Sequence, residues 1–188
     1  MRYIILLLAL ASFSLAQPLS LGKPNEEKQH SSWFNLGFGF GALSPVSSNY
    51  KQQGEAFFNP SILAGIQFAE LTAVTFELDW TRPDGGLGGW VGLEQQVLKT
   101  DITPFGELQL GARHPGYDKR DDHNFGDVFG FAGSVNAGFI FFRENPFRLR
   151  VKAGYEKIFN KCKDASWNAE VNFFFALGRP GVETIKVD

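Results

Sequence analysis

The chain has 188 residues, and its 18 Lys and Arg against 20 Asp and Glu give a formal charge of −2. That balance offers no electrostatic case for binding nucleic acid, and a single cysteine, Cys162, excludes an intramolecular disulfide framework. The 21 Gly and 20 Phe stand against one Met, and no apolar run after residue 16 is long enough for a spanning helix. If this chain crosses a membrane, it must therefore cross it as strands.

The first 32 residues are predicted to lie outside the folded domain. Residues 1–16 carry one cation, Arg2, followed by an apolar run with the small residues Ser14 and Ala16 before an expected cut at Gln17, which is typical of a secretory signal peptide. A buried N-terminal helix is the alternative, but the run has no amphipathic periodicity. Residues 17–32 are polar and aperiodic, and we expect a flexible segment.

Eight later segments alternate between apolar and small or polar residues. A period of two predicts β-strands, and about ten residues is the length that a tilted strand needs to cross a bilayer. The first segment opposes Phe to Gly, and FRLRVKAGY opposes a wholly apolar face to Arg148, Arg150 and Lys152. The expected strands, in chain order, are 33–43, 61–69, 72–81, 90–98, 104–113, 128–142, 147–155 and 166–177.

The connections between these segments are predicted to alternate in length. Polar or Gly-rich loops are expected at 43–59, 82–89, 114–127 and 159–164, and tight turns at 70–72, 99–103 and 143–146. Long loops at one end and short turns with both termini at the other are typical of bacterial outer-membrane barrels.

The charged residues of the segments share the face opposite the apolar one. In a soluble β-sandwich this face would meet water, whereas in an eight-stranded membrane barrel it would line the lumen, where the charges must pair. We favour the barrel, and expect Glu170 to pair with Arg150 or Lys152 because closure keeps the last strand beside the seventh. The predicted interior charge network comprises Glu77, Asp79, Glu94, Glu107, Arg113, Arg148, Arg150, Lys152, Glu156 and Glu170.

Three aromatic residues mark the long-loop end of the apolar face. Trp80, Tyr155 and Trp167 fall there together and are predicted to form an outer aromatic girdle. Trp90 lies at the same height on the inward phase, so either it fills the barrel mouth or the assumed register is one residue off.

The signal peptide, the eight alternating runs, the loop alternation and the Phe-rich last strand resemble the small OmpA/OmpX-type outer-membrane barrels of Gram-negative bacteria. The resemblance covers 33–178 and implies an all-β, eight-stranded antiparallel up-and-down transmembrane barrel in the bacterial outer membrane, with 179–188 as a periplasmic tail. It implies outer-membrane lipids, lipopolysaccharide and the assembly machinery as partners. The family's final aromatic residue is absent, since Leu177 precedes the tail RPGVETIKVD.

Few residues suggest chemistry. His114 and His123 bracket an acidic loop with Asp118, Asp121 and Asp122, whose spacing fits no metal loop. His114 with Ser166 is the single pair placed near the expected girdle where a lipid-modifying barrel enzyme would need it. We therefore expect no catalytic residue, no metal and no cofactor.

Cys162 is predicted to lie in an outward loop between Lys161 and Lys163, with its thiol in water. This placement would make the thiol a probe of the topology, because an odd number of wrongly assigned strands before it would move it to the periplasmic side.

The expected function is a non-enzymatic outer-membrane barrel with a charge-plugged lumen, acting in the envelope and through surface loops whose ligand the sequence does not name. The alternatives are a small pore or solute conduit, and a lipid A-modifying enzyme.

Overall fold

The computed structural model describes residues 33–46, 56–82, 85–114, 116, 128–143 and 145–177. The predicted signal peptide at 1–16, the segment 17–32 and the tail 179–188 lie outside these residues. Within them, no helix is long and apolar enough to cross a membrane.

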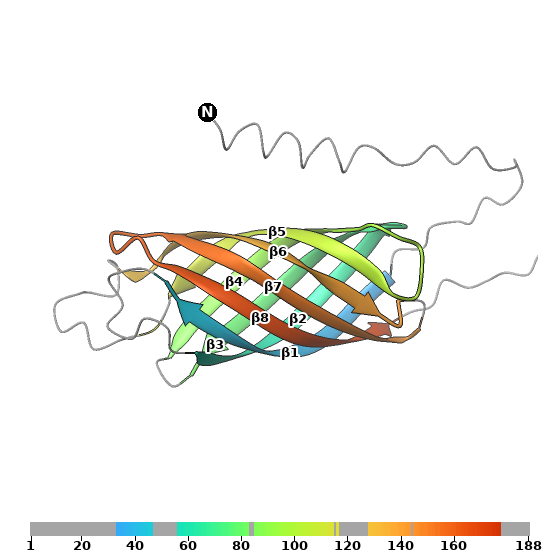
Figure 1. Ribbon diagram of the computed structural model, residues 1–188, viewed down its shortest axis with the longest axis horizontal. Coiled ribbons are helices and arrows are strands. Elements are labelled where there is room, and N and C mark those ends of the chain that lie inside the picture. The colour runs from blue at the N-terminus through green and yellow to red at the C-terminus, as the bar shows by residue number, and fades with distance from the viewer. Residues whose placement is uncertain are drawn as a thin grey trace, which may run out of the picture.

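Eight strands form one closed sheet (Figure 1). Every strand pairs antiparallel with the next in the chain, and β8 returns to pair with β1. This arrangement confirms the predicted all-β, eight-stranded antiparallel up-and-down barrel, and the two-sheet sandwich is wrong. The strands are β1 (Trp33–Pro45), β2 (Phe57–Ala69), β3 (Thr72–Thr81), β4 (Gly86–Gln96), β5 (Thr103–His114), β6 (Gly130–Phe141), β7 (Phe147–Phe159) and β8 (Ala165–Leu177).

The two ends of the barrel differ in what they carry. The chain enters β1 and leaves β8 at one end, which also holds connections 70–71, 97–102 and 142–146; we call it the terminus end. The opposite end, the loop end, holds connections 46–56, 82–85, 115–129 and 160–164. Figure 1 shows the strands tilted across the barrel between these ends.

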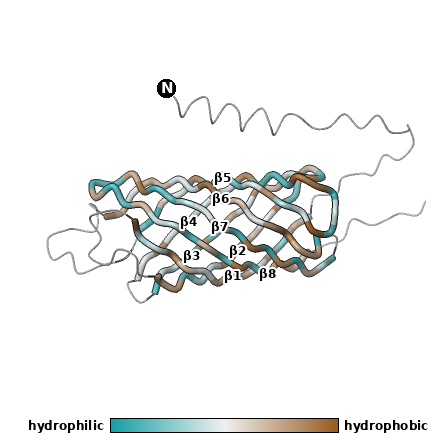
Figure 2. Tube along the Cα trace, in the orientation of Figure 1, coloured by the Kyte–Doolittle hydropathy of each residue, from teal (hydrophilic) through white to brown (hydrophobic). Residues whose placement is uncertain are grey.

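The barrel is apolar outside and polar inside. In β7, Val151 is 39% exposed while its neighbours Arg150 and Lys152 are 1% and 2% exposed, and Figure 2 shows the same alternation of hydropathy along the strands. Among the described residues, 26 polar or charged residues are buried against 13 hydrophobic ones. A soluble domain buries its apolar residues, so this distribution is inverted.

One predicted long loop is wrong. β4 begins at Gly86, not at Trp90, so the connection from β3 is 82–85 instead of 82–89. β7 continues to Phe159 and leaves 160–164 as its connection to β8, close to the predicted 159–164. The glycines that suggested a loop belong to the ladder, where Gly88 pairs with Asp79 and Arg113. A side chain there would collide with the lumen, since a Cβ on Gly88 would lie 2.7 Å from Asp79 Oδ2.

Candidate functional site: the charged lumen

The ten charged residues of the predicted interior network all point into the barrel, and none is more than 7% exposed. They come from β3, β4, β5, β7 and β8, and β7 alone supplies Arg148, Arg150, Lys152 and Glu156. Because a buried charge without a partner is costly, the arrangement depends on how these groups pair.

The middle of the lumen is built around Lys152 and Arg150. Lys152 Nζ lies 2.7 Å from Glu77 Oε2, 3.2 Å from Glu170 Oε2 and 3.9 Å from Glu107 Oε2. Arg150 forms an ion pair with Glu107 and reaches Glu94 Oε2 at 3.5 Å. Of the two cations that the sequence offers to Glu170, the structure brings Lys152 to it, directly across the β7–β8 ladder.

Neutral side chains supply further hydrogen bonds to these carboxylates. Thr75 Oγ1 donates to Glu107 Oε1 at 2.6 Å, and Gln109 Nε2 donates to Glu77 Oε2 at 3.0 Å. Asn172 Nδ2 donates to Glu170 Oε2 at 3.2 Å. The predicted network did not include these three residues, although each lies two positions from a carboxylate on the inward face of its strand, which was a usable signal.

A second cluster lies in the lumen towards the loop end. Arg113 contacts both oxygens of Asp79, at 2.8 and 2.9 Å, and its Nε lies 3.3 Å from Glu156 Oε1. Trp90 is 5% exposed and donates from Nε1 to Asp79 Oδ2 at 2.6 Å, and it packs with Ala132 and Ile158. Trp90 therefore fills the barrel mouth, and the assumed register was correct there.

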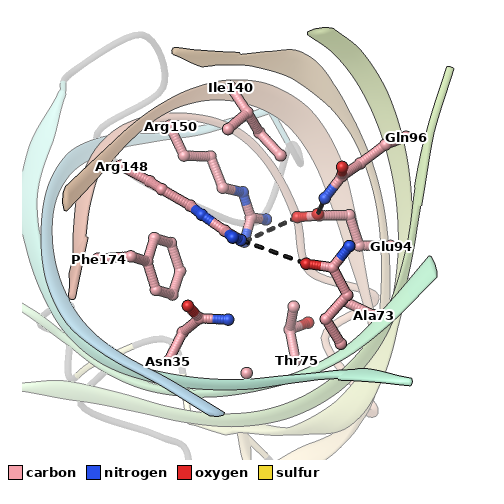
Figure 3. Close-up of a pocket in the computed structure, with 11 residues that line it drawn as sticks. Asn35, Ala73, Thr75, Glu94, Gln96, Ile140, Arg148, Arg150 and Phe174 are labelled. Carbon is pink, nitrogen blue, oxygen red and sulfur yellow. Dashed lines mark hydrogen bonds and ion pairs between the residues drawn. The ribbon is translucent and has the colours of Figure 1, made fainter. Parts of the chain in front are cut away.

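The terminus end is more open. Arg143, in the turn after β6, donates to Gln96 Oε1 at 2.7 Å and to the Glu70 carbonyl at 2.6 Å. Arg148 Nη1 donates to Gln67 Oε1 at 3.3 Å. At this end of the lumen there is a cavity of about 30 Å³, and its lining includes Arg148 and Arg150 (Figure 3).

Glycines on β1 make room for this packing. A Cβ on Gly41 would lie 2.5 Å from Glu170 Cγ, and one on Gly39 would lie 2.5 Å from Ser61 Oγ. The alternation of Phe with Gly in β1 thus places aromatic rings on the outer wall and leaves the inner wall bare where neighbouring side chains lie.

The three predicted girdle residues lie on the outer wall towards the loop end. Tyr155 and Trp167 face each other across β7 and β8 with ring centroids 5.1 Å apart, and they are 37% and 57% exposed. Trp80 is partly exposed on β3, opposite Leu87.

The structure bears on two placements predicted from the sequence, that of Cys162 and that of the pair His114 and Ser166. Cys162 is 5% exposed, so the prediction that its thiol lies in water is wrong; the short turn after β7 folds it inward between exposed Lys161 and Lys163. His114 and Ser166 lie on β5 and β8, which are not neighbouring strands.

Ser166 is on the inward face opposite Glu156, whereas a lipid-modifying site would need it at the outer wall. Of the acidic-loop residues, His123, Asp118, Asp121 and Asp122 fall outside the described part of the chain.

Comparison with known proteins identifies the fold. The neisserial surface protein NspA superposes with a TM-score of 0.56 at 12% identity, covering 78% of this chain and 97% of that one. The N-terminal barrel domain of Pseudomonas aeruginosa OprF gives 0.52 at 11% identity, covering 77% and 100%, and the outer membrane protein OprG of the same organism gives 0.53 at 11%, covering 79% and 97%. No protein-family model and no curated protein matches the sequence. The chain thus has the fold of the small outer-membrane barrels.

Proposed function

We propose that this protein is a non-enzymatic integral protein of the bacterial outer membrane, exported by a cleaved signal peptide, whose lumen is plugged by its own charged side chains. In this proposal it acts by supporting the envelope and by presenting its connections at the cell surface. The observation that carries the proposal is the inverted burial, with an apolar outer wall around an ion-paired interior.

The outer wall supports membrane residence. Large apolar side chains on all eight strands are exposed, among them Phe38 at 42%, Leu78 at 59% and Phe131 at 56%. Exposed apolar surface on this scale indicates contact with a membrane or a partner. In a closed barrel the backbone groups of every strand are hydrogen-bonded to a neighbouring strand, so none is left unpaired in hydrocarbon. Outer-membrane lipids, lipopolysaccharide and the assembly machinery are therefore the partners we propose.

The side chains that fill the lumen favour a plugged barrel over an open channel. Eight strands enclose an interior that side chains just fill, and the Arg113 cluster with Trp90 occupies the loop end while Lys152 and Arg150 cross the middle. An ion crossing the barrel would have to displace at least two sets of ion pairs.

Membrane fractionation tests the premise. We expect the protein in the outer-membrane fraction, with a gel mobility that changes when the sample is boiled, because boiling would unfold the compact closed barrel. Recovery as a soluble periplasmic protein would overturn the proposal.

A small conduit is the second candidate, and the cavity at the terminus end favours it. Planar-bilayer recording of the refolded barrel separates the two functions: a plugged lumen gives no discrete conductance steps, and reproducible steps would move the conduit ahead. Lipid A mass analysis after overexpression tests the enzyme alternative, for which we expect an unchanged spectrum.

A further inference from the structure

The cavity at the terminus end differs in charge from the rest of the lumen. Its lining includes two guanidinium groups, Arg148 and Arg150, but a single carboxylate, Glu94. The remaining members of the network are two cations, Arg113 and Lys152, against five carboxylates. One of those five, Glu107, pairs with Arg150, which leaves two cations against four carboxylates beyond the cavity. The lumen is therefore polarised, with its excess negative charge away from the terminus end.

The turn residue Arg143 strengthens this polarity. It is 8% exposed at the same end and holds Gln96, which itself lines the cavity. Gln96 in turn donates from Nε2 to Glu94 Oε1 at 3.0 Å, so the one lining carboxylate is engaged by an amide as well as by Arg150.

A polar group faces the cavity from the opposite wall. Asn35 is 6% exposed, and its Oδ1 is buried without a hydrogen-bond partner among the described residues. Figure 3 shows Asn35 across the lumen from Arg148 and Arg150. In Figure 3 the amide nitrogen of Asn35 points into the lumen, where it can donate to a ligand.

Gly65, which has no side chain, leaves space at the wall of the cavity. A Cβ on Gly65 would make ordinary van der Waals contact, with Val74 O nearest at 3.7 Å, so a side chain can be built there, unlike at Gly39 or Gly41. One water needs about 10–15 Å³, and the cavity of about 30 Å³ has room for a little more.

We infer that this cavity is a binding site for one small monovalent anion, a halide or a carboxylate of the size of formate, held by the guanidinium of Arg148 and the amide of Asn35. Guanidinium and amide N–H groups are the donors that such anions take. The cavity of about 30 Å³ matches an anion of this size, and the inference does not depend on the proposed role in the envelope.

The test is urea unfolding of the refolded protein in detergent, at constant ionic strength, in bromide or formate against gluconate, which is too bulky to enter. At ten times the dissociation constant, a bound anion lowers the unfolding equilibrium constant about elevenfold. We expect this difference in the unaltered protein and its loss in Arg148→Gln and in Gly65→Val, which fills the cavity and keeps every charge.

Gly106→Val is the matched control, because Gly106 faces outward with open space around it and should retain the difference. Bromide crystals of the unaltered protein give an independent readout, an anomalous peak between Arg148 and Asn35. Equal effects of all three anions, or an effect that survives both cavity variants, would overturn the inference, as would bromide crystals with water alone in the cavity.

Discussion

β7 and β1 contribute to the same lumen in opposite ways. β7 supplies four of the ten network charges, and their side chains reach partners on β3, β4, β5 and β8. β1 supplies none, and its inward glycines lie against Glu170 and Ser61. The comparison shows that the interior is filled from one side. The long inward side chains of β7 fit because a strand such as β1 carries glycines on its inward face. Both strands nevertheless present the same kind of apolar face outward.

The largest effect should come from removing a β7 cation. Arg150→Ala leaves Glu107 and Glu94 buried with one fewer partner, and we expect a loss of about 3–5 kcal/mol in the free energy of unfolding. Urea titration of folding in lipid vesicles measures it. A double-mutant cycle with Glu107→Gln should show coupling; additive losses would indicate a wet interior in which the ion pair contributes little.

The outer face of β7 should be nearly as sensitive. Val151→Arg puts a charge near the middle of the proposed membrane span, which should destabilise the barrel by about 2–4 kcal/mol. Thr100→Arg, in the exposed connection 97–102, is the control and should change stability by less than about 0.5 kcal/mol. Equal losses in the same folding assay would contradict the assignment of the outer wall.

Filling the β1 side should have a smaller effect. Gly41→Val drives a side chain against Glu170, and overpacking of this kind costs about 1–3 kcal/mol. Gly106→Val, on the open outer face, serves as its control. If both variants unfold at the same urea concentration, the inner face of β1 is not packed against β8 as described.

The smallest perturbation tests which end of the barrel faces out of the cell. Arg82→Cys, at an exposed position directly after β3, should react with a membrane-impermeant maleimide on intact cells, while the buried Cys162 should react after unfolding. Lys99→Cys, at the terminus end, should react when the outer membrane is permeabilised. Labelling of Lys99→Cys but not of Arg82→Cys on intact cells would reverse the proposed orientation.

Most of the fold could be predicted from the sequence alone, because alternation of residue type along a strand shows which residues share each of its two faces. The opposition of Val151 to Arg150 and Lys152 gave the inside and the outside of β7, and the same pattern in eight segments gave the barrel. The strand ends were less predictable. Gly86 to Gly89 look like a loop in isolation, and they join β4 because β3 and β5 pair with their backbone on both sides.

Pairing inside the lumen depended on the tertiary structure. The sequence left Glu170 between Arg150 and Lys152, and the β7–β8 register decides for Lys152 by placing the two residues directly opposite each other. Arg150 instead meets Glu94 and Glu107, which lie on strands that only closure of the barrel brings across from β7. The burial of Cys162 and the cavity beside Arg148 could not be predicted from the sequence either. Burial in a turn and empty space inside the barrel arise from packing in three dimensions and do not change the periodicity of the sequence.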